Sequence, residues 1–146
     1  ATVYLLGVPR VQDLYAAGVQ LEQSQGDVNC RSFWDTFDVC TIATLDTPLN
    51  GETHATRLTG IESRVQLYNE VLRDLAWEYS TNATNRNPLG IEVVADYVNE
   101  STPSVGTTSF DAGELNGGDC FHPNLQGQRL IATEAWNSNP REGTAP

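Results

Sequence analysis

Two short apolar runs with a helical pattern between them constrain the fold of this chain more than any other feature. The runs lie at residues 3–8 and 90–98, and neither alternates polar with apolar residues as a half-exposed strand would. Such runs indicate strands that are buried on both faces, which is typical of parallel sheets. Parallel strands need a crossover connection, usually a helix. The sequence therefore predicts an α/β fold in which helices flank a mostly parallel sheet.

The crossover helix has the clearest periodicity in the sequence. Its apolar residues recur at steps of three and four, and charged residues occupy the remaining faces, so the apolar stripe predicts the buried face. The stripe consists of Ile61, Val65, Tyr68, Leu72, Leu75 and Tyr79. A second helix is predicted from about Val11 to Leu21 by the same spacing.

Residues 29–60 lack a sustained period and contain Pro48 and Asn50-Gly51, so we expect a loop with short turns. Three aromatic residues lie within it, and they either line an apolar pocket or cover the edge of the sheet: Phe33, Trp34 and Phe37. The only histidine in this region, His54, has no helical context and is expected to be an exposed loop residue.

A second long segment, between Asn99 and Gly118, has about twenty residues rich in Ser, Thr, Gly and Pro. Loops of this length are usually functional or disordered. Because the segment leads into the motif described below, it is either a wall or lid of an active site or a plain surface loop.

Composition limits the kinds of partner. The 146 residues are enough for one domain, and 19 acidic against 8 basic side chains give a net charge of −11. This charge repels phosphate backbones and anionic lipid heads, so we expect no nucleic-acid partner. No apolar run is long enough to span a bilayer, so no transmembrane segment is expected. The chain has no Met and no signal-peptide pattern, and we expect Ala1 to be a processing site or a sequence boundary.

A candidate catalytic pair lies near the C-terminus, in the string Asp119-Cys120-Phe121-His122-Pro123-Asn124. A helical pattern follows as far as Trp136, and Pro123 is predicted at its first position. His122 would then precede a helix N-terminus, which disfavours a proton on imidazole and suits a general base. Asp119 is close enough to bind the other ring nitrogen and fix the tautomer. The alternative is a turn that leads into the helix with a carboxylate at its N-terminal end.

The longer string closely resembles the last conserved block of SGNH (GDSL-type) hydrolases, and it looks most like the phospholipase B-like and lipase/esterase branch. The resemblance includes Gly127, Leu130-Ile131-Ala132 and Trp136-Asn137. It implies an SGNH-like (flavodoxin-like) three-layer sandwich, of which residues 1–146 are the C-terminal part. It also implies a serine-type ester hydrolase without metal or organic cofactor, in which His122 is the general base and Asp119 orients it.

The same family uses a serine nucleophile in a Gly-Asp-Ser block and a Gly and an Asn of the oxyanion hole, and none of these blocks is in the sequence. Ser63 and Ser101 are expected to be ordinary polar positions. We therefore expect a separate N-terminal fragment to supply these groups, and the isolated chain to be inactive. The alternative is a non-catalytic binding or scaffolding domain that retains the fold.

Three cysteines allow three single-bridge pairings, and the sequence alone does not choose among them. We favour the Cys30–Cys40 pairing because it closes the shortest loop. A disulfide implies an oxidising compartment, and we therefore expect a secreted or periplasmic protein. Cys120 would then be a buried thiol behind the catalytic turn or a bridge to the missing fragment. Asn82 and Asn99 begin glycosylation-type triplets.

Metal sites find little support in the sequence. Two histidines and scattered acids lack the ligand spacing of a zinc site. Three carboxylates could surround a calcium ion but lack the dense acidic pattern of a calcium loop, namely those of Asp111, Glu114 and Asp119.

Overall fold

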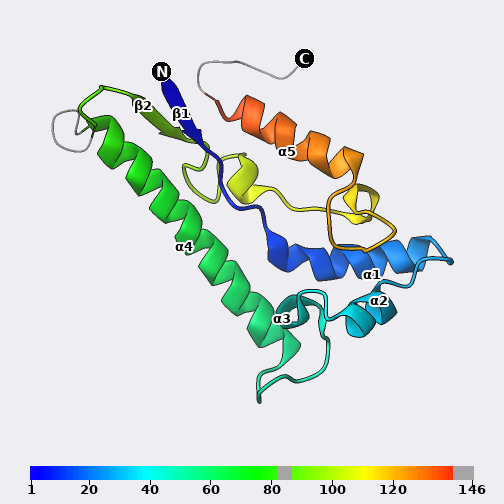
Figure 1. The fold of residues 1–146 in the computed structure, drawn as a ribbon. Helices are drawn as coiled ribbons and strands as arrows, with labels where there is room; N and C mark the ends of the chain where they lie inside the picture. The colour runs from blue at the N-terminus through cyan, green and yellow to red at the C-terminus, as the bar shows by residue number, and fades with distance from the viewer. Residues whose placement is uncertain (82–86, 140–146) are drawn as a thin grey trace. The chain divides into compact units, whose positions relative to one another are not determined.

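The computed structural model describes residues 1–81 and 87–139. The chain divides into two compact units (Figure 1). The sheet unit comprises Ala1–Pro9, Val65–Thr108 and Ile131–Pro146, and the helical unit comprises Arg10–Arg64 and Ser109–Leu130. The triplet that begins at Asn82 lies outside the described residues.

The sheet unit contains two parallel strands, β1 (Thr2–Leu5) and β2 (Glu92–Ala95), in register from Thr2↔Glu92 to Leu5↔Ala95. Helix α4 (His54–Thr81) precedes β2, and α5 (Leu125–Asn137) follows it in the chain (Figure 1). The predicted α/β class and parallel pairing are therefore confirmed. The described residues contain this one two-stranded sheet and do not show the three-layer sandwich that the resemblance implies.

The strands are not buried on both faces as predicted. Val3 and Leu6 are each 45% exposed, and every residue of β2 is only partly buried. The physical reason is the width of the sheet, because two strands alone leave both outer edges unpaired and most of each face uncovered.

The buried face of α4 also differs from the predicted stripe. Within the sheet unit the buried residues of α4 are Val65, Asn69 and Ala76, whereas Tyr68 from the stripe is 62% exposed. Hydrophobic periodicity does not predict this buried face, because its central residue, Asn69, is polar. Six large side chains of this part of α4 remain exposed, and Trp77 is one of them. The other five lie on one face of the helix, and we call them the exposed stripe of α4: Leu67, Tyr68, Val71, Leu75 and Tyr79.

Asn69 is fully buried and joins two segments of the sheet unit. Its Oδ1 accepts from the Val8 N–H at 2.7 Å, and its Nδ2 donates to the carbonyls of Val8 at 3.0 Å and Gly106 at 3.1 Å. A Cβ at Gly106 would lie 2.8 Å from that Nδ2, so only glycine allows this close approach. The amide thus satisfies three backbone groups that would otherwise be buried without a partner.

Asp96, the residue after β2, also joins two segments of the sheet unit through buried backbone groups. Its two carboxylate oxygens accept from the backbone N–H groups of Gly7 at 2.6 Å and Val105 at 2.7 Å. Burial raises the pKa of Asp96, although these donors act in the opposite direction. The residues after β2 are therefore fixed to the end of β1, and part of the predicted long loop is packed structure.

That segment contains two short 3-10 helices, η2 (Val105–Thr107) and η3 (Ala112–Glu114). Asn99 is exposed in the turn that precedes η2, where its Oδ1 accepts from the N–H of Ser101 at 2.8 Å. An exposed turn is the setting that a glycosylation acceptor requires.

The helical unit contains η1 (Val11–Asp13), α1 (Leu14–Ser24), α2 (Cys30–Phe37), α3 (Thr41–Thr44) and the first turns of α4. The predicted helix over residues 11–21 is confirmed. The predicted loop over 29–60 is wrong, since it contains α2, α3 and the start of α4. Asn29 caps α2, because its side-chain oxygen accepts the N–H of Ser32 at 3.2 Å. The core includes Leu14, Ala17, Leu21, Trp34, Ala43 and Leu115.

His54 is the first residue of α4 rather than an exposed loop residue. Its Nε2 lies 2.7 Å from the carbonyl oxygen of Ala43, and its ring centroid lies 4.3 Å from that of Tyr15. One turn further along, the buried guanidinium of Arg57 donates to the carbonyl of Ile42 in α3 and to three carbonyls of the α3–α4 connection: those of Leu45, Thr47 and Glu52. These contacts fix the connection to α4. None of the helices in the described ranges is long and apolar enough to cross a membrane.

Candidate active site

The turn before α5 is closed by backbone hydrogen bonds. The N–H of Asn116 donates to the carbonyl of His122 at 2.9 Å, and the N–H of Asn124 donates to the carbonyl of Glu114 at 2.8 Å. Leu115 and Pro123 form an antiparallel bridge between these contacts. Residues 116–122 are thereby held as a compact loop at the N-terminal end of α5.

Asn124, not Pro123, lies at the start of α5. Its Oδ1 accepts from the backbone N–H groups of Gln126 at 2.7 Å and Gly127 at 3.1 Å, which is the role of an N-cap. The prediction that Pro123 is the first helical residue is wrong by two positions, because the capping side chain of Asn124 fixes where the helix begins.

Asp119 and His122 are brought together as the sequence predicts. Oδ2 of Asp119 lies 2.9 Å from Nδ1 of His122. The second oxygen, Oδ1, accepts from the backbone N–H groups of Phe121 at 2.9 Å and His122 at 3.0 Å. The carboxylate is therefore bound at both oxygens. The His122 side chain is 73% exposed and that of Asp119 is 30% exposed.

These contacts favour the charged form of Asp119. Partial burial raises the pKa of Asp119, but the N–H donors of Phe121 and His122 and the imidazole outweigh it, and the pKa is lower than usual. Asp119 is therefore ionised at neutral pH and accepts the proton on Nδ1 of His122. In a neutral ring the other nitrogen, Nε2, is then an acceptor, and no serine of the described helical unit is hydrogen-bonded to it.

Acid should weaken this turn. Because the pKa of Asp119 is lower in the folded chain than its unfolded value of about 3.9, ionised Asp119 contributes stability that is complete above that value. This contribution is lost as the pH falls through the folded pKa. We expect the free energy of unfolding of the wild-type chain to fall more steeply below about pH 4 than that of Asp119→Asn, measured by urea unfolding at a series of pH values. Equal slopes for the two chains would contradict the assigned pKa direction.

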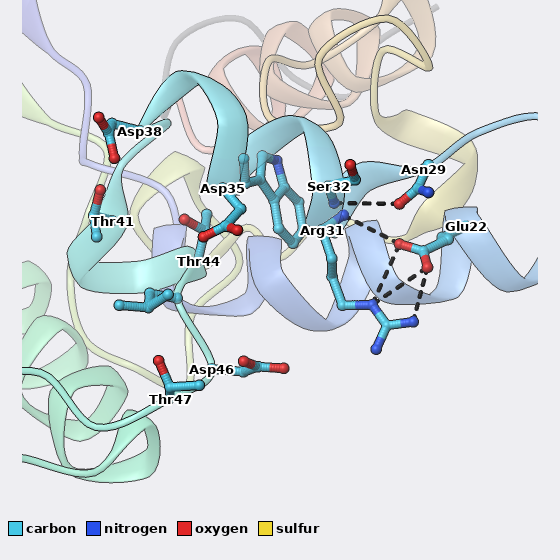
Figure 2. A pocket seen from close by; sticks show the side chains of 12 residues that line it. Glu22, Asn29, Arg31, Ser32, Asp35, Asp38, Thr41, Thr44, Asp46 and Thr47 are labelled. Carbon is cyan, nitrogen blue, oxygen red and sulfur yellow. Dashed lines mark hydrogen bonds and ion pairs between the residues drawn. The ribbon is translucent and has the colours of Figure 1, made fainter.

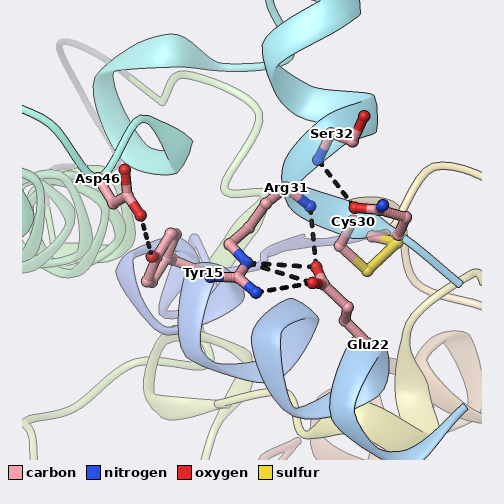
Figure 3. A network of polar contacts seen from close by, with 8 residues as sticks. Tyr15, Glu22, Cys30, Arg31, Ser32 and Asp46 are labelled. Carbon is pink, nitrogen blue, oxygen red and sulfur yellow. Dashed lines mark hydrogen bonds and ion pairs between the residues drawn. A yellow bond between two sulfur atoms is a disulfide. The ribbon is translucent and has the colours of Figure 1, made fainter. Parts of the chain in front are cut away.

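The disulfide of the described residues joins Cys30 to Cys120, with Cα atoms 5.4 Å apart, and Cys40 is a free, exposed thiol (Figure 3). The favoured Cys30–Cys40 pairing is therefore wrong. Helix α2 occupies Cys30–Phe37 and rises about 1.5 Å per residue, so Cys30 lies at its start and Cys40 beyond its far end.

Helix α2 also contacts the turn of residues 116–122, through Trp34. Its indole Nε1 donates to the backbone carbonyl of Asp119 at 3.1 Å. Of the three aromatic residues in this region, Trp34 is buried, whereas Phe33 and Phe37 stack on each other at 4.6 Å and Phe37 is largely exposed. All three aromatic residues belong to the helical unit.

A pocket of about 610 Å³ is lined by residues of α1, α2 and α3 (Figure 2). Trp34 is among its lining residues. The guanidinium of Arg31 at its wall is paired with Glu22, at 2.8 Å between Nη2 and Oε1 (Figure 3). Carboxylates and hydroxyls make most of the remaining lining: Asp35, Asp38, Thr41, Thr44, Asp46 and Thr47. Of the three aromatic residues weighed as the lining of an apolar pocket, Trp34 alone lines this one, and its polar lining was not expected because residues 29–60 were assigned to a loop. The Asn29-x-x-Ser32 spacing, an N-cap signal, is the feature that could have indicated α2.

The carboxylates weighed as calcium ligands have other roles. Asp111 accepts the N–H of Gly113 at 2.8 Å, and Glu114 accepts the N–H of Asp111 at 2.9 Å, so the two cap η3. Within residues 1–81 and 87–139, no three His, Cys, Asp or Glu side chains form a group that could hold a metal ion.

The chain was compared with protein-family models, with curated proteins and with solved structures, and none of these comparisons gave a match.

Proposed function

We propose that this chain is part of a serine-type ester hydrolase and supplies the Asp and His of a Ser-His-Asp triad. The observation that carries the proposal is the 2.9 Å contact of Asp119 Oδ2 with Nδ1 of an exposed His122. In such triads the carboxylate fixes the tautomer, and the free Nε2 accepts a proton from the nucleophile. A separate N-terminal fragment supplies the serine and the oxyanion hole.

In the proposed reaction the serine Oγ of that fragment attacks the carbonyl carbon of the ester. Nε2 of His122 takes the hydroxyl proton and returns it to the leaving alcohol, and water then releases the acid from the acyl-enzyme by the same proton route. The ionised Asp119 stabilises the imidazolium that forms in each step. The developing oxyanion is held by donors outside this chain.

Two features of the sheet unit support a second polypeptide. The outer edges of β1 and β2 have no strand beside them in the described residues, and unpaired edges are templates for another chain. The exposed stripe of α4 adds five large apolar side chains on one helix face, which is typical of an interaction surface. The Cys30–Cys120 disulfide supports a secreted or periplasmic location.

Labelling of the native preparation with a fluorophosphonate probe tests the proposal, because the probe reacts with serines that an adjacent base activates. We expect one labelled polypeptide that co-purifies with this chain, and mass spectrometry should place the label on a serine outside residues 1–146. The competing function is a non-catalytic binding or scaffolding domain. Absence of any label, or label on Ser63 or Ser101 of this chain, would contradict the proposed triad.

A further inference from the structure

Cys120 has a backbone conformation that needs support from its surroundings. Its φ is +56°, in the left-handed region that residues with a Cβ rarely adopt. The conformation has a purpose in the turn, because Cys120 separates Asp119 from the two N–H groups that its carboxylate binds. If Cys120 relaxed to a right-handed or extended conformation, the N–H groups of Phe121 and His122 would no longer face Oδ1 of Asp119.

Three contacts hold this residue and the one before it. The disulfide ties the Cys120 side chain to Cys30, and the indole of Trp34 binds the Asp119 carbonyl at 3.1 Å. The N–H of Cys120 donates to the carbonyl of Asn116 at 2.7 Å. The first two contacts come from one face of α2, because Cys30 and Trp34 are four residues apart on that helix.

The indole itself has little freedom to move. Trp34 is buried, and it packs so closely on α1 that a Cβ at Gly18 would lie 2.4 Å from the ring atoms Cη2 and Cζ2. The ring is therefore held between Gly18 and the turn, and its N–H keeps a fixed direction toward Asp119. Such support from rigid neighbours is what a functional turn in a strained conformation requires.

We propose that Trp34 and the Cys30–Cys120 disulfide are positioning residues for the Asp119–His122 pair. They keep Cys120 left-handed, and this keeps the Asp119 carboxylate on Nδ1 of His122, so that Nε2 stays the unprotonated nitrogen. Their catalytic meaning rests on the proposed function, but the positioning itself is a property of this chain alone.

The tautomer of His122 reports the positioning directly. ¹⁵N NMR of the imidazole nitrogens, at a pH where the ring is neutral, distinguishes a proton on Nδ1 from one on Nε2. We expect the oxidised wild-type chain to hold the proton on Nδ1. In Trp34→Phe, and in the double variant Cys30→Ser/Cys120→Ser, the population of that tautomer should fall at least twofold in favour of the Nε2–H form that free histidine prefers.

Two further variants make the test specific. Trp136→Phe removes an indole from α5 outside the helical unit and should leave the tautomer unchanged. Cys30→Ser/Cys120→Gly also lacks the disulfide, but glycine adopts positive φ without strain, so it should recover part of the Nδ1–H population that the Ser/Ser variant loses. Circular dichroism verifies that each variant is folded.

An unchanged Nδ1–H population in folded Trp34→Phe and in the folded Ser/Ser variant would overturn the proposal. If the cysteine variants do not fold, Trp34→Phe decides alone, since it keeps the aromatic ring and removes only the donor. Because the readout needs no turnover, a positive result together with absent fluorophosphonate labelling would reject the proposed function and leave the positioning role standing.

Discussion

Replacing His122 with Ala should lower kcat of the enzyme assembled from both polypeptides by a factor on the order of 10⁶, measured with a short-chain nitrophenyl ester. The variant removes the group that accepts the serine proton. Its effect on folding should be small, because the side chain is 73% exposed and contacts only side chains of its own turn, those of Asp119 and Phe121. Apart from the loss of the contact with Asp119, the substitution should change the free energy of unfolding by less than about 0.5 kcal/mol.

Asp119→Asn should lower the same kcat by about 10⁴-fold. The amide oxygen can still accept the backbone N–H groups of Phe121 and His122, but the NH₂ group would face Nδ1 of His122 and favour the tautomer with the proton on Nε2. The control is His54→Ala, which removes the other histidine, with its contact to the Ala43 carbonyl, and should leave kcat unchanged. Full activity of His122→Ala would refute the proposed role of His122.

Asn69→Leu should have the largest effect on stability. Leucine has a similar size but satisfies none of the three backbone groups that the buried amide binds, namely the N–H and carbonyl of Val8 and the carbonyl of Gly106. Each buried group left without a partner costs about 1–3 kcal/mol, so we expect a loss of at least about 3 kcal/mol. This is a large fraction of the stability of an ordinary domain.

Urea unfolding followed by circular dichroism measures the loss. Glu70→Leu, one residue further along α4 at an exposed position, is the matched control and should change the free energy of unfolding by less than about 0.5 kcal/mol. A loss below about 1 kcal/mol for Asn69→Leu would show that Val8 and Gly106 find other partners when the amide is absent.

Features that depend on local spacing could be predicted from the sequence. The strand–helix–strand order follows from hydrophobic periodicity, and the contact of Asp119 with His122 follows from a three-residue interval within one turn. Helix α2 was missed because it has only eight residues and a mixed surface, in which Phe37 is exposed while Trp34 is buried. Its capping residue, Asn29, was a clearer signal than its apolar pattern.

Features that depend on distant contacts could not be predicted in this way. The disulfide closes over 90 residues because folding brings the start of α2 to the turn of residues 116–122, whereas the nearer Cys40 lies beyond the end of the helix. The buried position of Asn69 depends likewise on two segments, around Val8 and Gly106, that are remote in the sequence. A polar residue becomes a core residue only when such partners surround it.

Trp34 has two structural roles, so any substitution at this position has two effects. One face of the side chain lines the pocket of about 610 Å³, while its ring nitrogen holds the carbonyl of Asp119. A smaller residue at this position would widen the pocket and at the same time release the turn that carries His122. A substitution of Trp34 therefore changes the size of the pocket and the order of His122 together.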